Sequence, residues 1–215
     1  MPLHQTLLDF LFPRRSLLGV EGGWVTEDEF YELKSYPVIL DHAHLKSVDI
    51  HSLDRVVASA DYEQLPLLKR AIHTFKYRRM RAMGPVLGQL LMPASGLLQR
   101  EPAPVLCPVP LHWTRRFFRG FNQAEILANV VSYETGWDTN TLLLVRNRPT
   151  GHQAWRGREE RFKAVNGAFI AYGNVPESVV LIDDLFTTGA TLDACAKVLK
   201  AAGAKQVQAL VVARG

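Results

Sequence analysis

Short apolar runs alternate with amphipathic segments through the second half of the chain. Runs of four to six apolar residues are typical of buried strands, and apolar residues three and four apart are typical of helices. The runs predict strands over residues 105–109, 141–145, 168–171, 178–182 and 207–212. The spacing predicts helices over residues 122–133 and 190–202. This alternation predicts an α/β fold in which a parallel sheet is flanked by helices.

The first third of the chain has a different pattern. Residues 63–91 carry apolar positions at helical spacing, and Gly84-Pro85 predicts a break within that helix. Residues 1–62 hold short apolar pieces without a sustained period. With 215 residues the chain can form one sizeable domain and a small appendage. We therefore expect a small N-terminal extension over residues 1–62 and an α/β domain over residues 63–215.

Composition narrows the class of protein. The chain is 47% hydrophobic and 21% charged, as is ordinary for a folded protein, and its apolar runs are too short to span a bilayer. Asp9 interrupts the apolar cluster of residues 1–18, and no small-residue cleavage site follows, so we interpret the cluster as an amphipathic helix. These features predict a cytoplasmic protein without membrane insertion. Cys107 and Cys195 are too few for a four-thiolate zinc site and are expected to be buried.

The strongest chemical signal lies in residues 179–191. An apolar run is followed by Asp183-Asp184-Leu185-Phe186 and then by Thr187-Thr188-Gly189-Ala190-Thr191, where a helix begins. Open α/β sheets bind ligands at the carboxyl ends of their strands, and a helix N-terminus attracts phosphate through its unpaired amides and dipole. Gly189 permits close approach of the backbone, and threonine hydroxyls add donors without negative charge. The segment therefore predicts a phosphate pocket formed by residues 187–191.

A phosphate pocket alone would bind weakly. Four charge-assisted hydrogen bonds at about 1.5 kcal/mol each give about 6 kcal/mol before the cost of association, which corresponds to tens of micromolar affinity at best. Asp183 and Asp184 can supply specificity by accepting hydrogen bonds from vicinal ribose hydroxyls, and two neighbouring carboxylates also attract Mg²⁺. The alternative is that one of these acids only caps the helix.

The segment resembles the phosphoribosyl-pyrophosphate (PRPP) motif of type I phosphoribosyltransferases, in which apolar residues precede Asp-Asp, two further residues and Thr-Thr-Gly-x-Thr. The resemblance implies that Asp183 and Asp184 hold the ribose hydroxyls and a PRPP-bound Mg²⁺, while Thr187 to Thr191 hold the 5-phosphate.

A second, basic loop follows the strand predicted at residues 105–109. Its residues include Pro108, Val109, Arg115, Arg116 and Arg119, and by composition it could be a solvated basic turn. Type I enzymes place a pyrophosphate-binding loop at this position, and guanidinium groups bond phosphate oxygens bidentately. The resemblance therefore implies that Pro108, Val109, Arg115 and Arg116 bind the ligand and that Arg119 assists catalysis with Asp183 and Asp184.

The motifs PVPLH at residues 108–112, RGFNQAE at 119–125 and the Asp-Asp loop together resemble the ComF/GntX family of phosphoribosyltransferase-like proteins over residues 60–215. That family normally opens with a Cys-x-x-Cys zinc ribbon, whereas Ser16 and Gly19 occupy those positions here. Neither residue offers a thiolate, so residues 1–62 are expected to be a degenerate ribbon without zinc. Asp41, His42, His44, Asp49 and His51 could in principle bind a metal, but clustered surface histidines are commoner.

The basic segment Trp155–Lys163 allows two interpretations. It falls where type I enzymes have a flexible lid over the pyrophosphate, and its charges could equally lie on an exposed helix with Glu159 paired to Lys163.

Two functions compete. The first is a phosphoribosyltransferase that binds PRPP with Mg²⁺, transfers the phosphoribosyl group to an unknown acceptor and releases pyrophosphate. The second is a non-catalytic competence protein that binds single-stranded DNA and partner proteins during DNA uptake, as the resemblance implies. The net charge of +4 suits an anionic ligand in both cases, and the stretch Trp113–Arg119 could combine base stacking with phosphate contacts, although such aromatic residues are more often packed.

Overall fold

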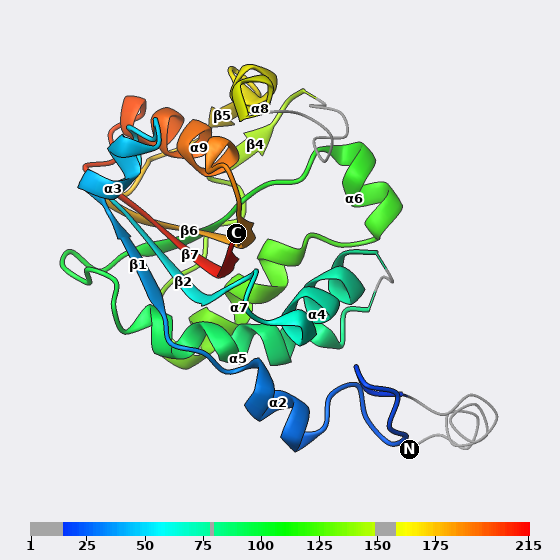
Figure 1. Ribbon diagram of the computed structural model, residues 1–215. Helices are drawn as coiled ribbons and strands as arrows, with labels where there is room; N and C mark the ends of the chain where they lie inside the picture. Colours follow the sequence, from blue (N-terminus) through cyan, green and yellow to red (C-terminus); the bar gives the residue numbers. More distant parts are fainter. Residues whose placement is uncertain (1–14, 78–79, 149–157) are drawn as a thin grey trace.

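A five-stranded sheet lies between two layers of helices in the computed structural model, which describes residues 15–77, 80–148 and 158–215 (Figure 1). The strands are β1 (Val38–Asp41), β2 (Arg55–Asp61), β3 (Val105–Pro108), β4 (Leu144–Arg146), β5 (Phe169–Ala171), β6 (Ser178–Phe186) and β7 (Gln206–Arg214). The helices are α2 (Glu27–Leu33), α3 (His42–Ser47), α4 (Pro66–Tyr77), α5 (Met83–Ser95), α6 (Trp113–Arg119), α7 (Gln123–Thr135), α8 (Arg158–Val165) and α9 (Ala190–Ala201).

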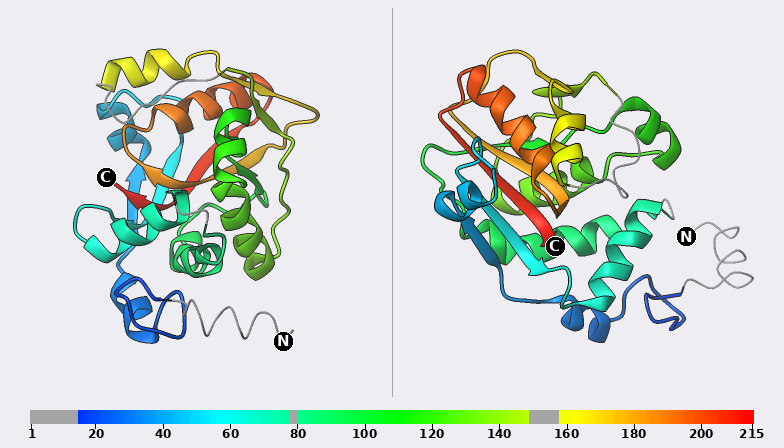
Figure 2. Two further views of the ribbon diagram at one scale, coloured as in Figure 1. Left: turned by 90° about the vertical axis from the view of Figure 1, so that its right-hand side faces the viewer. Right: turned by 45° about the horizontal axis from the view of Figure 1, so that its top comes forward.

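The main sheet has the order β1-β2-β7-β6-β3 and is parallel except at β1, which pairs antiparallel with β2. Helices α4, α5 and α7 lie on one face, and α3, α8 and α9 lie on the other (Figure 2). Alternate residues of β6 enter the two cores, Val180 and Ile182 on the α5 side and Val179 and Leu181 on the α9 side. The expected α/β architecture with a mostly parallel sheet is confirmed.

Two of the predicted strands do not join this sheet. β4 and β5 pair antiparallel with each other in a separate two-stranded sheet next to α8 (Figure 1). Each has three residues, and the burial of β4 alternates along its length, with Val145 exposed between two buried neighbours. A ribbon that is buried on one face only explains why these segments stay outside the central layer.

The helical segment 63–91 is broken as predicted, but the break lies before Gly84-Pro85, because α4 ends at Tyr77 and α5 begins at Met83. Gly84 and Pro85 lie in the first turn of α5, where proline is tolerated because its missing N–H has no helical partner in any case. A side chain at Gly84 would overlap Ile126, and one at Gly88 would overlap Val130. These glycines therefore serve the close packing of α5 against α7 rather than the end of a helix.

Residues of the expected extension contribute to the main sheet. β1 and β2 both lie within residues 1–62, and β2 pairs along its length with β7. The sheet therefore continues across residue 62. The run Val56–Ala60 is fully apolar apart from Ser59, but it is too short to show a period in the sequence.

A buried carboxylate organises the segment before β1. Glu29, which is 2% exposed, accepts hydrogen bonds from Ser16 Oγ at 2.7 Å and from the Thr26 and Leu18 amides. These hydrogen bonds lower the pKa of Glu29 although burial opposes them. Ser16 occupies one of the two positions where the family resemblance would place a zinc-ribbon cysteine. Here it donates a hydrogen bond to this carboxylate instead. Across the described residues no helix combines the length and apolar character needed to cross a bilayer.

Candidate functional site

The loop between β6 and α9 is short. β6 runs to Phe186 instead of ending at Ile182, because it keeps pairing with β7 up to Phe186 opposite Arg214. Both acids therefore lie within the strand, and only Thr187, Thr188 and Gly189 connect it to the helix. Gly189 has φ +75° and caps α9, whose first hydrogen bond runs from the Asp193 N–H to the Gly189 carbonyl at 2.9 Å. The amides of residues 190–192 thus precede the hydrogen-bonded ladder of the helix, as anion binding requires.

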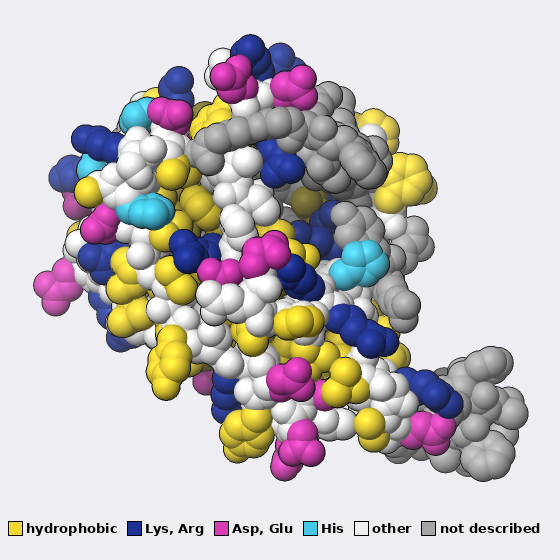
Figure 3. All heavy atoms as spheres, viewed as in Figure 1, with side chains coloured by type: hydrophobic (Ala, Val, Ile, Leu, Met, Phe, Trp, Pro, Cys, Tyr) yellow, Lys and Arg dark blue, Asp and Glu magenta, His cyan; other side chains and the backbone are white. Residues whose placement is uncertain are grey.

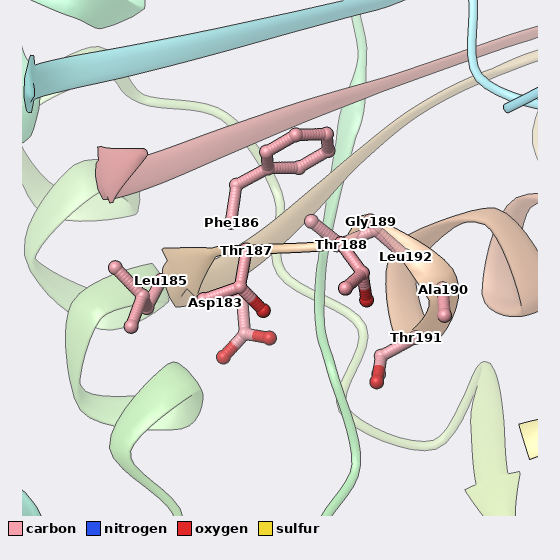
Figure 4. A pocket seen from close by; sticks show the side chains of 9 residues that line it. All are labelled: Asp183, Leu185, Phe186, Thr187, Thr188, Gly189, Ala190, Thr191 and Leu192. Atoms are coloured by element: carbon pink, nitrogen blue, oxygen red, sulfur yellow. The ribbon is translucent and has the colours of Figure 1, made fainter. Parts of the chain in front are cut away.

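The polar side chains of this loop share one side. The Asp183 carboxylate and the threonine hydroxyls point to the same side of the chain, while the Phe186 ring points to the opposite side (Figure 4). They line a pocket of about 300 Å³ with Leu185, Gly189, Ala190 and Leu192. Residues 187–191, predicted to hold phosphate, therefore surround one hollow.

Residues distant in the sequence hold this loop in place. The position of a Gly189 side chain is filled by Ile50 Cδ1 and by the Phe186 ring, so only glycine fits. The Asp193 carboxylate accepts hydrogen bonds from the amides of His51 and Ser52 at 3.1 and 2.7 Å. The connection before β2 therefore positions the start of α9.

Asp184 forms the floor of the adjoining cleft. Its carboxylate is 5% exposed and makes an ion pair with Lys76 of α4 at 2.8 Å. The sequence did not single out Lys76 as a site residue, because it lies more than a hundred positions from Asp184. Asp184 therefore already has a half-buried cationic partner within the protein.

Asp183 is held in an environment that disfavours its ionised form. Burial and the neighbouring Asp184 charge raise its pKa to about 7, although Lys76 and Arg119 act in the other direction. Its carboxylate accepts a hydrogen bond from the adjacent Asp184 amide at 2.8 Å. A carboxyl group that titrates near neutral pH and lines a cleft can bind a ligand that favours its ionised form.

The cleft beside the phosphate pocket has an empty volume of about 670 Å³ and joins both predicted loops. Arg119 and Arg146 line it with Lys76, together with the carboxyl groups of Asp183 and Asp184, so cationic side chains outnumber acidic ones in its walls. Lys and Arg side chains also border the hollow on this side of the molecule (Figure 3). Arg146 is 7% exposed and lies 5.3 Å from the Phe169 ring centroid. A basic residue directly after the apolar run 141–145 was the only sequence signal for Arg146.

Side-chain hydrogen bonds at the start of α7 hold the basic loop that follows β3. Asn122 donates from Nδ2 to the Val109 carbonyl at 3.1 Å and caps α7 by accepting from the Ala124 amide. Arg119 donates to Gln123 Oε1 at 3.1 Å, and both side chains line the cleft. Gln123 Nε2 is buried without a hydrogen-bond partner in the described part of the chain.

The other residues predicted for this loop are placed as follows. Val109 lines the cleft and its amide donates to the Ile182 carbonyl, whereas Pro108 is buried at the end of β3 and does not line it. Arg116 is exposed and makes an ion pair with Glu125 at 3.1 Å. Arg115 belongs to α6, but its side chain lies outside the described part, as do residues 155–157 of the predicted lid. The remainder of that segment forms α8, from which Arg161 donates to Thr187 Oγ1 at 3.4 Å.

A protein-only metal cage is absent from the described residues, where no group of three or more His, Cys, Asp and Glu side chains could hold an ion. Asp183 and Asp184 offer two carboxylates, one of which is paired with Lys76. Mg²⁺ commonly uses one or two carboxylates together with substrate phosphates and water. The donor set therefore fits a Mg²⁺ ion that arrives with a phosphorylated ligand.

The chain is similar in sequence to proteins named for DNA utilization or competence. The chain is 32% identical over 168 residues to the DNA utilization protein YhgH of Salmonella typhi, which covers 74% of this chain and 72% of that protein. It is 28% identical over 172 residues to competence protein F of Haemophilus influenzae, and 36% identical over 107 residues to competence protein ComFC of Streptococcus pneumoniae, the latter covering 49% of this chain and 46% of that protein. A scan against family models finds no match. Among solved structures, TT1426 from Thermus thermophilus aligns over 64% of this chain and 84% of its own at 18% identity, with a TM-score of 0.32.

Proposed function

Because the chain belongs to the ComF family of competence and DNA-utilization proteins, we propose that it binds a phosphorylated ribose, PRPP or ribose 5-phosphate, at the end of β6. One observation carries the proposal: a phosphate-sized pocket at the start of α9 opens beside a cationic cleft, and Asp183 lines both. An anion pocket next to a carboxylate matches a ligand that combines phosphate with vicinal hydroxyls.

Each part of the ligand has a matching part of the site. The amides and hydroxyls of residues 187–191 would bind the 5-phosphate, and Asp183 would accept hydrogen bonds from the ribose. Lys76, Arg119 and Arg146 would face the pyrophosphate of PRPP. Mg²⁺, when bound, would neutralise part of the pyrophosphate charge, held by Asp183 and ligand oxygens.

The same arrangement could support phosphoribosyl transfer. A nucleophile would attack the anomeric carbon, the bond from that carbon to the pyrophosphate oxygen would break, and pyrophosphate would leave with the electron pair. Arg119, oriented by Gln123, would stabilise the negative charge on the leaving pyrophosphate. Asp183 would position the ribose, and Asp184 would position Lys76 through their ion pair. No described residue identifies the acceptor, so pyrophosphate release with a panel of nucleobases and amines tests for turnover.

Calorimetric titration and thermal melting with PRPP and Mg²⁺ test the binding proposal. We expect saturable heat and a higher melting temperature for the unmodified chain. Asp183→Asn should weaken binding at least tenfold, while Asp138→Asn, the same change at an exposed acid, should leave it unaltered. Ribose 5-phosphate and pyrophosphate, titrated separately, resolve the two halves of the site. If millimolar PRPP gives neither heat nor a shift in melting temperature, the proposal is wrong.

A second candidate function rests on helix α6. Trp113, Phe117 and Phe118 are 71%, 77% and 70% exposed on this helix, and Arg116 lies among them. Exposed aromatic side chains interspersed with arginine form the type of surface that stacks single-stranded bases and contacts their phosphates. We propose that α6 binds single-stranded DNA, and that partner competence proteins act with it.

Fluorescence anisotropy with a labelled oligonucleotide over a salt series tests this role. Base stacking is worth about 1–3 kcal/mol per base, so Trp113→Ala with Phe117→Ala should weaken binding at least tenfold. Tyr133→Ala, which removes an aromatic ring that is 88% exposed on α7, is the matched control. Equal losses in both variants, or no binding at low salt, would exclude α6 as the DNA site.

A further inference from the structure

A second cavity lies on the α5 side of the sheet and shares no residue with the cleft at the end of β6. It has an empty volume of about 550 Å³ between α2, α5 and the strands β2 and β7. Water-sized atoms can be centred in about 190 Å³ of this space, which is far more than one water molecule needs.

The floor of the cavity is apolar apart from one hydroxyl group. Leu33, Ala60, Leu90 and Val212 are all at most 6% exposed. Ser59 lies among them, 5% exposed, and its Oγ has no hydrogen-bond partner within the described residues. An unsatisfied buried hydroxyl costs about 1–3 kcal/mol. A heteroatom of a bound molecule would satisfy it.

The rim is polar and exposed. Lys34, Ser35 and Gln89 line the cavity and are exposed, so the cavity reaches solvent on their side. The Lys34 ammonium lies 4.9 Å from the ring centroid of Phe30, another lining residue, and 4.4 Å from that of Tyr31, which does not line the cavity, so the positive charge lies at the rim. Pro93 also lines the cavity, and because proline has no N–H it cannot donate to the Gln89 carbonyl one turn earlier in α5.

The wall that α2 provides is well anchored. Thr26 and Glu29 form a complete capping box at the start of the helix. The Glu29 carboxylate also accepts from Ser16 Oγ and the Leu18 amide. Because α2 is held from both sides of its first turn, the cavity is a consequence of the packing rather than of a loose helix.

We propose that this cavity binds a small organic acid with an apolar body. The body would cover the floor, a heteroatom at its inner end would pair with Ser59, and its anionic group would lie at Lys34. The site is independent of the phosphorylated ribose proposed at the end of β6.

Two dyes with the same ring system test the proposal on the full chain. 8-Anilinonaphthalene-1-sulfonate carries an anion, and N-phenyl-1-naphthylamine is its neutral counterpart. We expect saturable fluorescence with both dyes. Lys34→Glu should weaken the anionic dye about tenfold and change the neutral dye less than twofold. Lys46→Glu, the same charge change at an exposed lysine of α3, should affect neither dye.

Two further measurements locate the dye. Ser59→Leu fills the floor and should abolish binding of both dyes; if this variant does not fold by thermal melting, the Lys34→Glu result decides. Millimolar pyrophosphate should leave the anionic dye bound, and displacement would place the dye in the cationic cleft instead. Lack of saturable binding, displacement by pyrophosphate, or equal effects of the two lysine changes would each overturn the proposal.

Discussion

The floor of the cleft and the loop that forms its wall treat charge in opposite ways. On the floor, the Asp184 carboxylate is buried against the Lys76 ammonium at 2.8 Å. In the wall, the Asp183 carboxyl has its pKa raised to about 7, and the threonine hydroxyls face an open pocket. The protein itself provides the first acid with a partner, and we propose that the second is available to a ligand. On that proposal, adjacent residues of identical chemistry have different roles, one structural and one in binding.

Loss of the Asp184 charge should have the largest effect. Asp184→Asn would leave the Lys76 ammonium, whose side chain is 17% exposed, without its ion-pair partner; breaking a buried pair costs about 3–5 kcal/mol, and we expect a loss near the lower end of that range. Denaturant unfolding at neutral pH measures the loss. Asp184→Asn combined with Lys76→Met should recover most of the stability, because neither member of the pair is left charged without its partner. An Asp184→Asn protein as stable as the parent would show that the floor is not held by this pair.

A side chain at Gly189 should come next. Gly189→Ala imposes a left-handed backbone on alanine, at about 1–2 kcal/mol, and adds the overlap with Ile50 and Phe186. We expect a loss of about 2–4 kcal/mol together with weaker phosphate binding. Gly136 has nearly the same φ, +73°, and open space around it, so Gly136→Ala isolates the backbone contribution. Equal losses at the two glycines would contradict the packing role of Ile50.

Asp183→Asn should change stability in the other direction. A carboxyl whose pKa is raised by folding is destabilising in its ionised form, so the neutral amide should add about 1–3 kcal/mol at pH 8. The gain should disappear towards pH 4, where the parent carboxyl is protonated in the folded state. Thermal melting at the two pH values checks this, and an Asp183→Asn protein less stable at pH 8 would assign Asp183 a structural role.

The smallest effect concerns the pH dependence of ligand affinity. Ionised Asp183 accepts hydrogen bonds from hydroxyls and attracts Mg²⁺, so affinity for PRPP with Mg²⁺ should rise severalfold between pH 6 and pH 8. The ligand phosphate also titrates near pH 6. The Asp183→Asn profile, measured by calorimetry, contains that contribution alone. Parallel profiles for the two proteins would separate Asp183 from binding.

The sequence predicts the wall of the cleft far better than its floor. A strand, a glycine-containing turn and a helix are contiguous, so the hollow at residues 187–191 could be anticipated from local pattern. Lys76 could not, because only the packing of α4 against the sheet brings it to Asp184. The sequence does not separate β4 and β5 from the main sheet, since short apolar runs look alike in a two-stranded ribbon and in a buried layer. It predicts the break between α4 and α5 but places it at Gly84-Pro85, because a packing glycine and a terminating one are identical in sequence.

The contact of residues 50–52 with the start of α9 also bears on how the chain can be rearranged. Ile50, His51 and Ser52 belong to a connection that precedes β2, yet they determine where Gly189 and Asp193 lie. A chimaera that exchanged the first third of this chain for that of a relative would import a different support beneath the anion pocket. Swaps that keep residues 48–54 native should tolerate a foreign N-terminus, whereas swaps that replace them should lose affinity at a pocket that was never mutated.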